Sequence, residues 1–194
     1  MTKDQIIKNA EKIDGWMLPG ELEAIYDACQ SVLKKGSLAV EVGSYHGRSS
    51  YVIASVCKEK GAKLICMDTF CGCASQDYLY VSTTKEAIEE FIAKDIGKNL
   101  KGLPVEYIVG DSTETYKQIE DNSADYIFID GEHYNPGVTK DIDNFWPKVK
   151  KGGTYSGHDY SEAFQDVLKA VNKKFPDRIE RETKFSIWLV RDKK

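Results

Sequence analysis

Acidic residues recur at one kind of position in this 194-residue chain, at or near the end of a short apolar run. If these runs are parallel strands, their carboxyl ends share one rim, where open α/β sheets bind ligands. One acid there would only cap a helix or start a turn, but several acids on one rim repel one another. We therefore expect a positive partner among them: a cationic cofactor, a metal ion or both. The acids are Glu41, Asp68, Asp111, Asp130 and Asp159.

The first run, Leu38–Val42, leads into the small-residue turn Gly43-Ser44-Tyr45-His46-Gly47. A strand, glycine turn and helix in succession expose backbone N–H groups to a nucleotide-like ligand. The spacing matches neither the dinucleotide fingerprint G-x-G-x-x-G nor the phosphate loop G-x-x-x-x-G-K-[ST]. An acid two residues before Gly43 suits a ligand with positive charge or ribose hydroxyls. S-adenosylmethionine has an ammonium, a sulfonium and a ribose, and it has no phosphate.

Strand and helix patterns alternate along most of the chain, which predicts a doubly wound, mostly parallel α/β sheet of seven strands. Two closing runs, 178–182 and 185–191, would form an antiparallel pair at one edge. The length is that of a single domain. Within it we expect an N-terminal helical cap over residues 1–36 and the core over residues 37–194. The aperiodic segment 71–83, with Tyr78 and Tyr80, reads as a lid or substrate loop.

Composition narrows the partners. The net charge is −4, from 31 acids and 27 bases, so nucleic acid gains no support as a partner. The chain has no apolar run of about 18 residues, so no membrane span is expected. The N-terminus lacks the apolar segment of a signal peptide, which predicts a cytoplasmic protein. The sequence leaves open both a monomer and a homodimer.

These motifs together resemble the class I S-adenosylmethionine-dependent methyltransferases. In particular they resemble the small bacterial enzymes that include sugar O-methyltransferases of antibiotic tailoring. The likeness spans residues 15–192 and implies a Rossmann-like methyltransferase fold. It also implies an enzyme that methylates a hydroxyl of a small molecule or a sugar. Its motifs are Asp68-Thr69-Phe70, Asp130-Gly131-Glu132-His133-Tyr134, Gly152-Gly153 and His158-Asp159-Tyr160.

The resemblance also implies which residues hold the cofactor. Those of the glycine turn would surround its methionine part, those after the second strand its ribose, and those after the third strand its adenine. Asp130 would complete the set. For Asp68 and Asp111, helix or turn capping is an alternative role. The implied residues are Glu41, Gly43, Ser44, Gly47, Asp68, Thr69, Phe70, Asp111, Ser112 and Asp130.

Asp130, His158 and Asp159 resemble the divalent metal set of the family, with Mg²⁺ or Mn²⁺ as the expected ion. His158 stands where the family often has a second acid. A nitrogen ligand shifts preference from Mg²⁺ towards Mn²⁺, Fe²⁺ or Zn²⁺, or removes the metal altogether. His133 is the predicted general base, because its usual pKa is near neutral, and Asp130 acts with it. A local role for His133 and a base role for Glu132 are the alternatives.

Two other functions are consistent with the sequence. One is a catalytically inactive module that only binds S-adenosylmethionine. The other is a metal-dependent, hydroxylase-like enzyme on the same scaffold. His133, Asp130 and His158 would nominally supply the two histidines and one carboxylate that non-haem iron requires.

Overall fold

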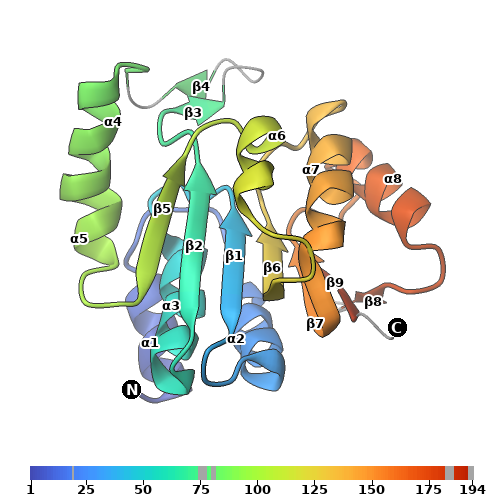
Figure 1. Cartoon of the computed structure of the whole chain (residues 1–194), viewed down its shortest axis with the longest axis horizontal. Helices are drawn as coiled ribbons and strands as arrows, with labels where there is room; N and C mark the ends of the chain where they lie inside the picture. The colour runs from blue at the N-terminus through green and yellow to red at the C-terminus, as the bar shows by residue number, and fades with distance from the viewer. Residues whose placement is uncertain (19, 74–77, 80–81, 182–185, 192–194) are drawn as a thin grey trace.

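The computed structural model describes residues 1–18, 20–73, 78–79, 82–181 and 186–191 (Figure 1). The expected lid or substrate loop, 71–83, lies partly outside these ranges, and Tyr80 is one of the residues outside them. Its described part includes β3 (Gly72–Cys73) and β4 (Tyr78–Leu79), which pair antiparallel. The role of this segment stays a prediction.

A seven-stranded sheet forms the centre of the described chain, in the order β5-β2-β1-β6-β7-β9-β8. The pairs from β5 to β7 are parallel, and those of β9 with β7 and β8 are antiparallel. β8 has only two residues, and each of the other strands has at least four. The prediction of a doubly wound, mostly parallel sheet with an antiparallel edge is therefore confirmed. The strands are β1 (Leu38–Val42), β2 (Lys63–Asp68), β5 (Val105–Val109), β6 (Ala124–Ile129), β7 (Val149–Gly157), β8 (Glu180–Arg181) and β9 (Trp188–Arg191).

The central strands are apolar because helices cover both of their faces. Every residue of β6 is buried, and so are four of the five in β1. Such strands read as continuous hydrophobic runs, which is why they were recognisable in the sequence. β7 starts at Val149, whereas the residue pattern after Gly152-Gly153 predicts a strand that begins at Thr154. The extra residues include Gly152 at φ +77°, close to a register shift against β6, so the two glycines allow an irregular strand to continue.

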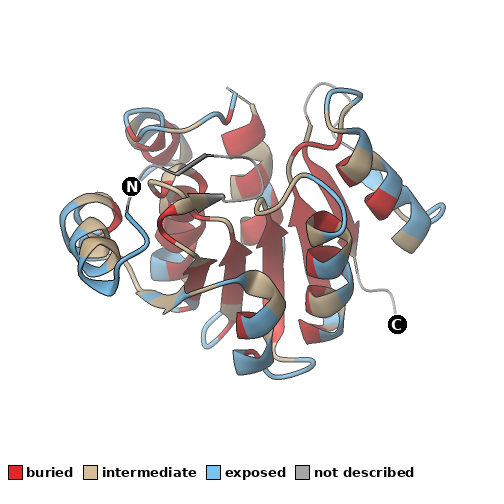
Figure 2. Cartoon of the chain, turned by 90° about the horizontal axis from the view of Figure 1, so that it is seen from above, coloured by how far each residue is buried: buried red, intermediate tan, exposed pale blue. Residues whose placement is uncertain are grey.

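Two layers of helices enclose the sheet, as the buried strands between half-exposed helices in Figure 2 illustrate. One layer holds α1, α2 and α3 together with the continuous segment α4-η2-α5, and the other holds α6, α7 and α8. Short turns η3 (Tyr116–Gln118) and η4 (Trp146–Lys148) follow α6 and α7. The helices are α1 (Lys3–Ala10), α2 (Glu21–Val32), α3 (Arg48–Lys60), α4 (Lys85–Phe91), η2 (Ile92–Ile96), α5 (Gly97–Asn99), α6 (Ser112–Thr115), α7 (Gly137–Phe145) and α8 (Gln165–Lys174).

The two N-terminal helices pack beside α3, and α2 also contacts β6 and β7. Their buried residues Ile6, Ile7, Leu22 and Ile25 belong to the core on that face of the sheet. α1 is closed at its start by Thr2, whose side chain accepts from the N–H of Gln5. The division into a cap and a core stays a prediction.

Gly43, directly after β1, is required by a close approach of two backbones. Its φ is +85°, and a Cβ at this position would lie 2.0 Å from the carbonyl oxygen of Asp130. The N–H of Asp130 donates to the carbonyl of Val42 at 2.8 Å, so the ends of β1 and β6 are held together. No side chain fits between them.

We predict that Gly43→Ala lowers the free energy of unfolding by about 3 kcal/mol or more, because it adds both strain and a clash. Gly36→Ala is the matched control: its φ is +80°, but a Cβ there meets nothing within 4 Å. It should cost only about 1 kcal/mol. Urea unfolding followed by circular dichroism measures both losses. Equal losses would contradict the close approach.

Candidate active site

Glu41 supports the glycine turn through a hydrogen bond to Ser44. Its carboxylate is buried, and Oε2 accepts hydrogen bonds from Ser44 Oγ at 2.9 Å and from Ser50 Oγ in the first turn of α3. Burial raises the pKa of Glu41 to about 7, although the serine hydrogen bonds lower it. Glu41 thus ties the turn to α3, and its predicted contact with the cofactor stays a prediction.

Asp68 holds the same turn from the side of β2. Its Oδ2 accepts the backbone N–H groups of Ser44 at 2.7 Å and Tyr45 at 2.9 Å, and its Oδ1 accepts that of Phe70 at 2.8 Å. Three such bonds fix the carboxylate and the turn together. Thr69 next to it donates to the carbonyl of Gly72 at 2.8 Å. The structure therefore gives Asp68 the turn-capping role, while its ribose contact stays a prediction.

Asp111 and Ser112 lie at the start of α6. Asp111 is the N-cap residue, and its Oδ1 accepts from the N–H and the hydroxyl of Thr113 at 2.8 and 2.7 Å. Ser112 donates to the buried carboxylate of Asp141, whose pKa burial raises to about 6. Capping is thus the observed role of Asp111, and the predicted adenine contact of this pair stays a prediction.

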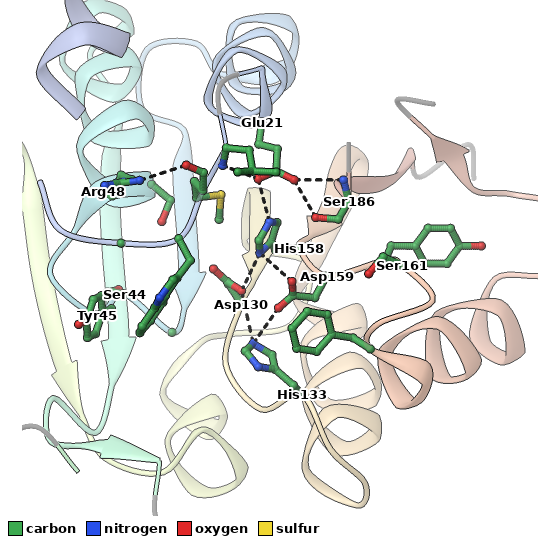
Figure 3. A pocket seen from close by; sticks show the side chains of 18 of the residues that line it. Glu21, Ser44, Tyr45, Arg48, Asp130, His133, His158, Asp159, Ser161 and Ser186 are labelled. Atoms are coloured by element: carbon green, nitrogen blue, oxygen red, sulfur yellow. Dashed lines mark hydrogen bonds and ion pairs between the residues drawn. The ribbon is translucent and has the colours of Figure 1, made fainter. Parts of the chain in front are cut away.

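A cavity of about 640 Å³ opens beside the glycine turn (Figure 3). Its walls come from that turn, from the residues after β6 and β7, and from the segment between α1 and α2. Asp130 and Asp159 line it together with both predicted histidines, His133 and His158. This volume is typical of small-molecule sites. Asp68 lies outside this lining, and so does Asp111.

The segment between α1 and α2 is held over the turn by Arg48, a residue that was not predicted to belong to the site. Arg48 donates from Nε to the carbonyl of Ile13 at 2.7 Å and from Nη1 to that of Met17 at 3.0 Å. Trp16 in this segment stacks on Tyr45, with ring centroids 4.7 Å apart. The signal available in the sequence was the position of Arg48 directly after the second glycine of the turn.

His133 lies between two carboxylates on the cavity wall. Its Nε2 is 3.1 Å from Asp159 Oδ2 and 3.6 Å from Asp130 Oδ1, and its ring meets Phe164 edge-on. Burial lowers the pKa of His133, but the nearby carboxylates outweigh burial and raise it. The structure thus brings together the two residues predicted to be catalytic, His133 and Asp130.

His158 is surrounded by three carboxylates. Its Nε2 lies 3.1 Å from Glu21 Oε2, and its Nδ1 lies 3.3 Å from Asp159 Oδ1 and 3.5 Å from Asp130 Oδ1. Burial lowers the pKa of His158, but the three acids outweigh burial and raise it to about 11. The ring is therefore an imidazolium, so the chain itself supplies a positive charge among the clustered acids, and the expected cationic cofactor or metal ion stays a prediction. Glu21 was not foreseen.

Among the described residues, one group has the composition of a divalent cation site: Asp130, His133 and Asp159, whose donor atoms lie within 4.8 Å of one another. His133 Nε2 is buried and makes no hydrogen bond within the described chain, which fits a nitrogen ligand. The predicted metal set instead combined Asp130 and Asp159 with His158. Both ring nitrogens of His158 face carboxylates here, and that metal set stays a prediction.

Comparisons with known proteins agree with this architecture. A model of the methyltransferase-domain family matches residues 40–160, from β1 to just beyond β7. No functionally curated protein matches the chain. Within the described chain, no helix is long and apolar enough to cross a membrane.

Solved structures similar to the chain share its fold at low sequence identity. An S-adenosylmethionine-dependent O-methyltransferase from Thermotoga maritima has a TM-score of 0.64 at 18% identity, with 96% of this chain and 71% of that one covered. The TDP-rhamnose 3′-O-methyltransferase of calicheamicin biosynthesis has a TM-score of 0.59 at 12% identity, with 97% of this chain and 92% of that one covered. An rRNA methylase from Streptococcus thermophilus has a TM-score of 0.57 at 13% identity, with 92% of this chain and 97% of that one covered. The expected Rossmann-like methyltransferase fold is confirmed, and the named acceptors differ too widely for the fold to define one.

The raised pKa of Glu41 predicts a pH dependence of stability. The folded protein binds the carboxyl proton of Glu41 more tightly than the unfolded chain, in which the pKa of this group is near 4.5. The resulting stabilisation is complete below pH 4.5 and is lost as the pH rises through 7. Glu41→Gln cannot ionise, so relative to wild type it should gain on the order of 3 kcal/mol between pH 4.5 and 8. Urea unfolding at a series of pH values tests this, and parallel curves for the two proteins would refute it.

Proposed function

The chain belongs to the methyltransferase-domain family, and we propose that it transfers a methyl group from S-adenosylmethionine to a hydroxyl of a small molecule or a sugar. Family membership makes it an enzyme of the methyltransferase class and supports S-adenosylmethionine as the donor. One observation carries the choice of a hydroxyl acceptor: His133 lies on the cavity wall with Nε2 between Asp130 and Asp159.

The proposed mechanism assigns the donor to the side of the cavity formed by the glycine turn. Gly43 and Ser44 line that side, and Asp130 lies beside Gly43 across the ends of β1 and β6. A methionine moiety on the turn would direct its sulfonium towards Asp130, where the carboxylate favours positive charge. The wall that carries His133 then remains for the acceptor.

Methyl transfer from a sulfonium requires alignment with the attacking oxygen and removal of the hydroxyl proton. His133 is the group proposed to take that proton. The resulting imidazolium would lie between the carboxylates of Asp159 and Asp130, at 3.1 and 3.6 Å, which stabilise it. Phe164 packs against the ring and restricts its orientation.

A divalent ion, if bound, would be held by Asp130, His133 and Asp159, and it would supply Lewis-acid lowering of the hydroxyl pKa. In that case His133 is a ligand and not the base. Neither alternative function is favoured by the comparisons: a module without activity finds no support in them, and neither does a hydroxylase.

The test is turnover, followed as S-adenosylhomocysteine released from S-adenosylmethionine with a panel of sugar and phenolic hydroxyl acceptors. His133→Ala should lower the rate by about 10²- to 10⁴-fold, because it removes the proton acceptor. Its affinity for S-adenosylmethionine, measured by calorimetry, should stay within about twofold of wild type.

Glu132→Gln is the comparison variant, because Glu132 is the alternative base next to His133. It should retain most of the turnover. Loss of turnover in Glu132→Gln with normal rates in His133→Ala would transfer the role of base to Glu132. Equal loss of donor binding in both variants would contradict the division of roles.

A further inference from the structure

Glu21 is a buried carboxylate that arrives at the site from a distant part of the chain. It is the first residue of α2 and is 1% exposed. Oε2 accepts the N–H of Leu18 at 2.7 Å and contacts His158 Nε2 at 3.1 Å. Oε1 accepts the N–H and the hydroxyl of Ser186 at 3.1 and 2.7 Å. Hydrogen bonds from Leu18 and Ser186 thus fix both carboxylate oxygens independently of His158.

This fixed carboxylate determines how the His158 ring can lie. With Nε2 directed at Glu21, the opposite edge of the ring presents Nδ1 to Asp159 and Asp130. A ring flipped about its long axis would lose these contacts. Glu21 therefore selects one orientation and requires a proton on Nε2.

The orientation of His158 is passed on to His133 through Asp159. Asp159 directs Oδ1 at His158 and Oδ2 at His133, at 3.3 and 3.1 Å. Its backbone has φ +59°, so the residue is held in a conformation that few side chains adopt. Glu21, His158, Asp159 and His133 form a continuous series of contacts, which Figure 3 shows from α2 to the cavity wall.

We propose that Glu21 is a positioning residue of the methyltransferase site, which acts by orienting His158 and, through Asp159, the ring of His133. The proposal rests on the proposed function in taking His133 as the proton acceptor. It extends that function to the first turn of α2, which the family match over residues 40–160 does not reach.

Glu23 supplies the matched control. It lies in the same turn of α2, and its Oε2 accepts the N–H of Gly20 at 2.6 Å, an ordinary helix-capping contact. Glu23→Gln removes a carboxylate at the start of α2 without touching His158. Glu21→Gln keeps the shape of the side chain but replaces one carboxylate oxygen by an NH2 donor, so it cannot accept from both His158 and Ser186.

The experiment uses ¹⁵N-labelled histidine, because the chain has only three histidines and their ring signals can be assigned one by one. In wild type, His158 should show a protonated Nε2. Glu21→Gln should lose that signal and shift the ring signals of His133, whereas Glu23→Gln should change neither. An unchanged His133 in folded Glu21→Gln would overturn the proposal.

Glu21→Asp takes the place of Glu21→Gln if the latter does not fold. It keeps the charge but withdraws the carboxylate from His158 by one methylene, so the His133 ring signals should again shift. An unchanged His133 in this variant would equally overturn the proposal.

Donor binding and kinetics separate this proposal from the proposed function. Failure of wild type to bind S-adenosylmethionine in calorimetry would refute the proposed function. The positioning role of Glu21 would still be tested by the ring signals of His133. With an acceptor found, Glu21→Gln should lower kcat by roughly a hundredfold through misplacement of the base, with KM for the donor within about twofold. A fall confined to donor binding would contradict the positioning role.

Discussion

The pairing of one buried imidazole with three carboxylates is the interaction on which the rest of the site depends. Glu21, Asp130 and Asp159 converge on His158 from α2, the end of β6 and the end of β7. Burying any one of these charges alone would cost free energy, and removing one partner would leave the others buried without their counter-charge. The ends of two strands and the start of a helix must therefore be placed together, and the cavity wall follows from their placement.

Four of the five acids on the sheet rim divide into two kinds by what their oxygens contact, and the fifth, Asp111, caps α6. Glu41 and Asp68 face inward to the glycine turn and fix its backbone and its serines. Asp130 and Asp159 face the cavity and the two histidines. The first kind shapes the surface on which a donor would lie, and the second provides negative charge where a proton would move in the proposed mechanism. In the proposed mechanism, this separation would place donor and acceptor on different walls of one cavity.

Much of the fold and part of the site could be predicted from local patterns. Buried strands read as apolar runs, and an acid near each strand end located the rim. The D-G-x-H and H-D-Y motifs brought Asp130, His133, His158 and Asp159 to it. Contacts across long stretches of chain could not be predicted, because no local pattern encodes them: Glu21 meets a residue 137 positions away. The contact between Glu21 and His158 could not be foreseen for the same reason, and the prediction of His158 as a metal ligand was made without it.

The most direct test of this account is a calorimetric titration of the purified protein with S-adenosylmethionine, performed with and without a chelator. Saturable binding of one donor per chain is expected under both conditions, because the donor would lie against the glycine turn and the imidazolium of His158 already provides positive charge among the carboxylates of the cavity. Absence of saturable binding in both titrations would contradict the assignment of the cavity to a methyl donor.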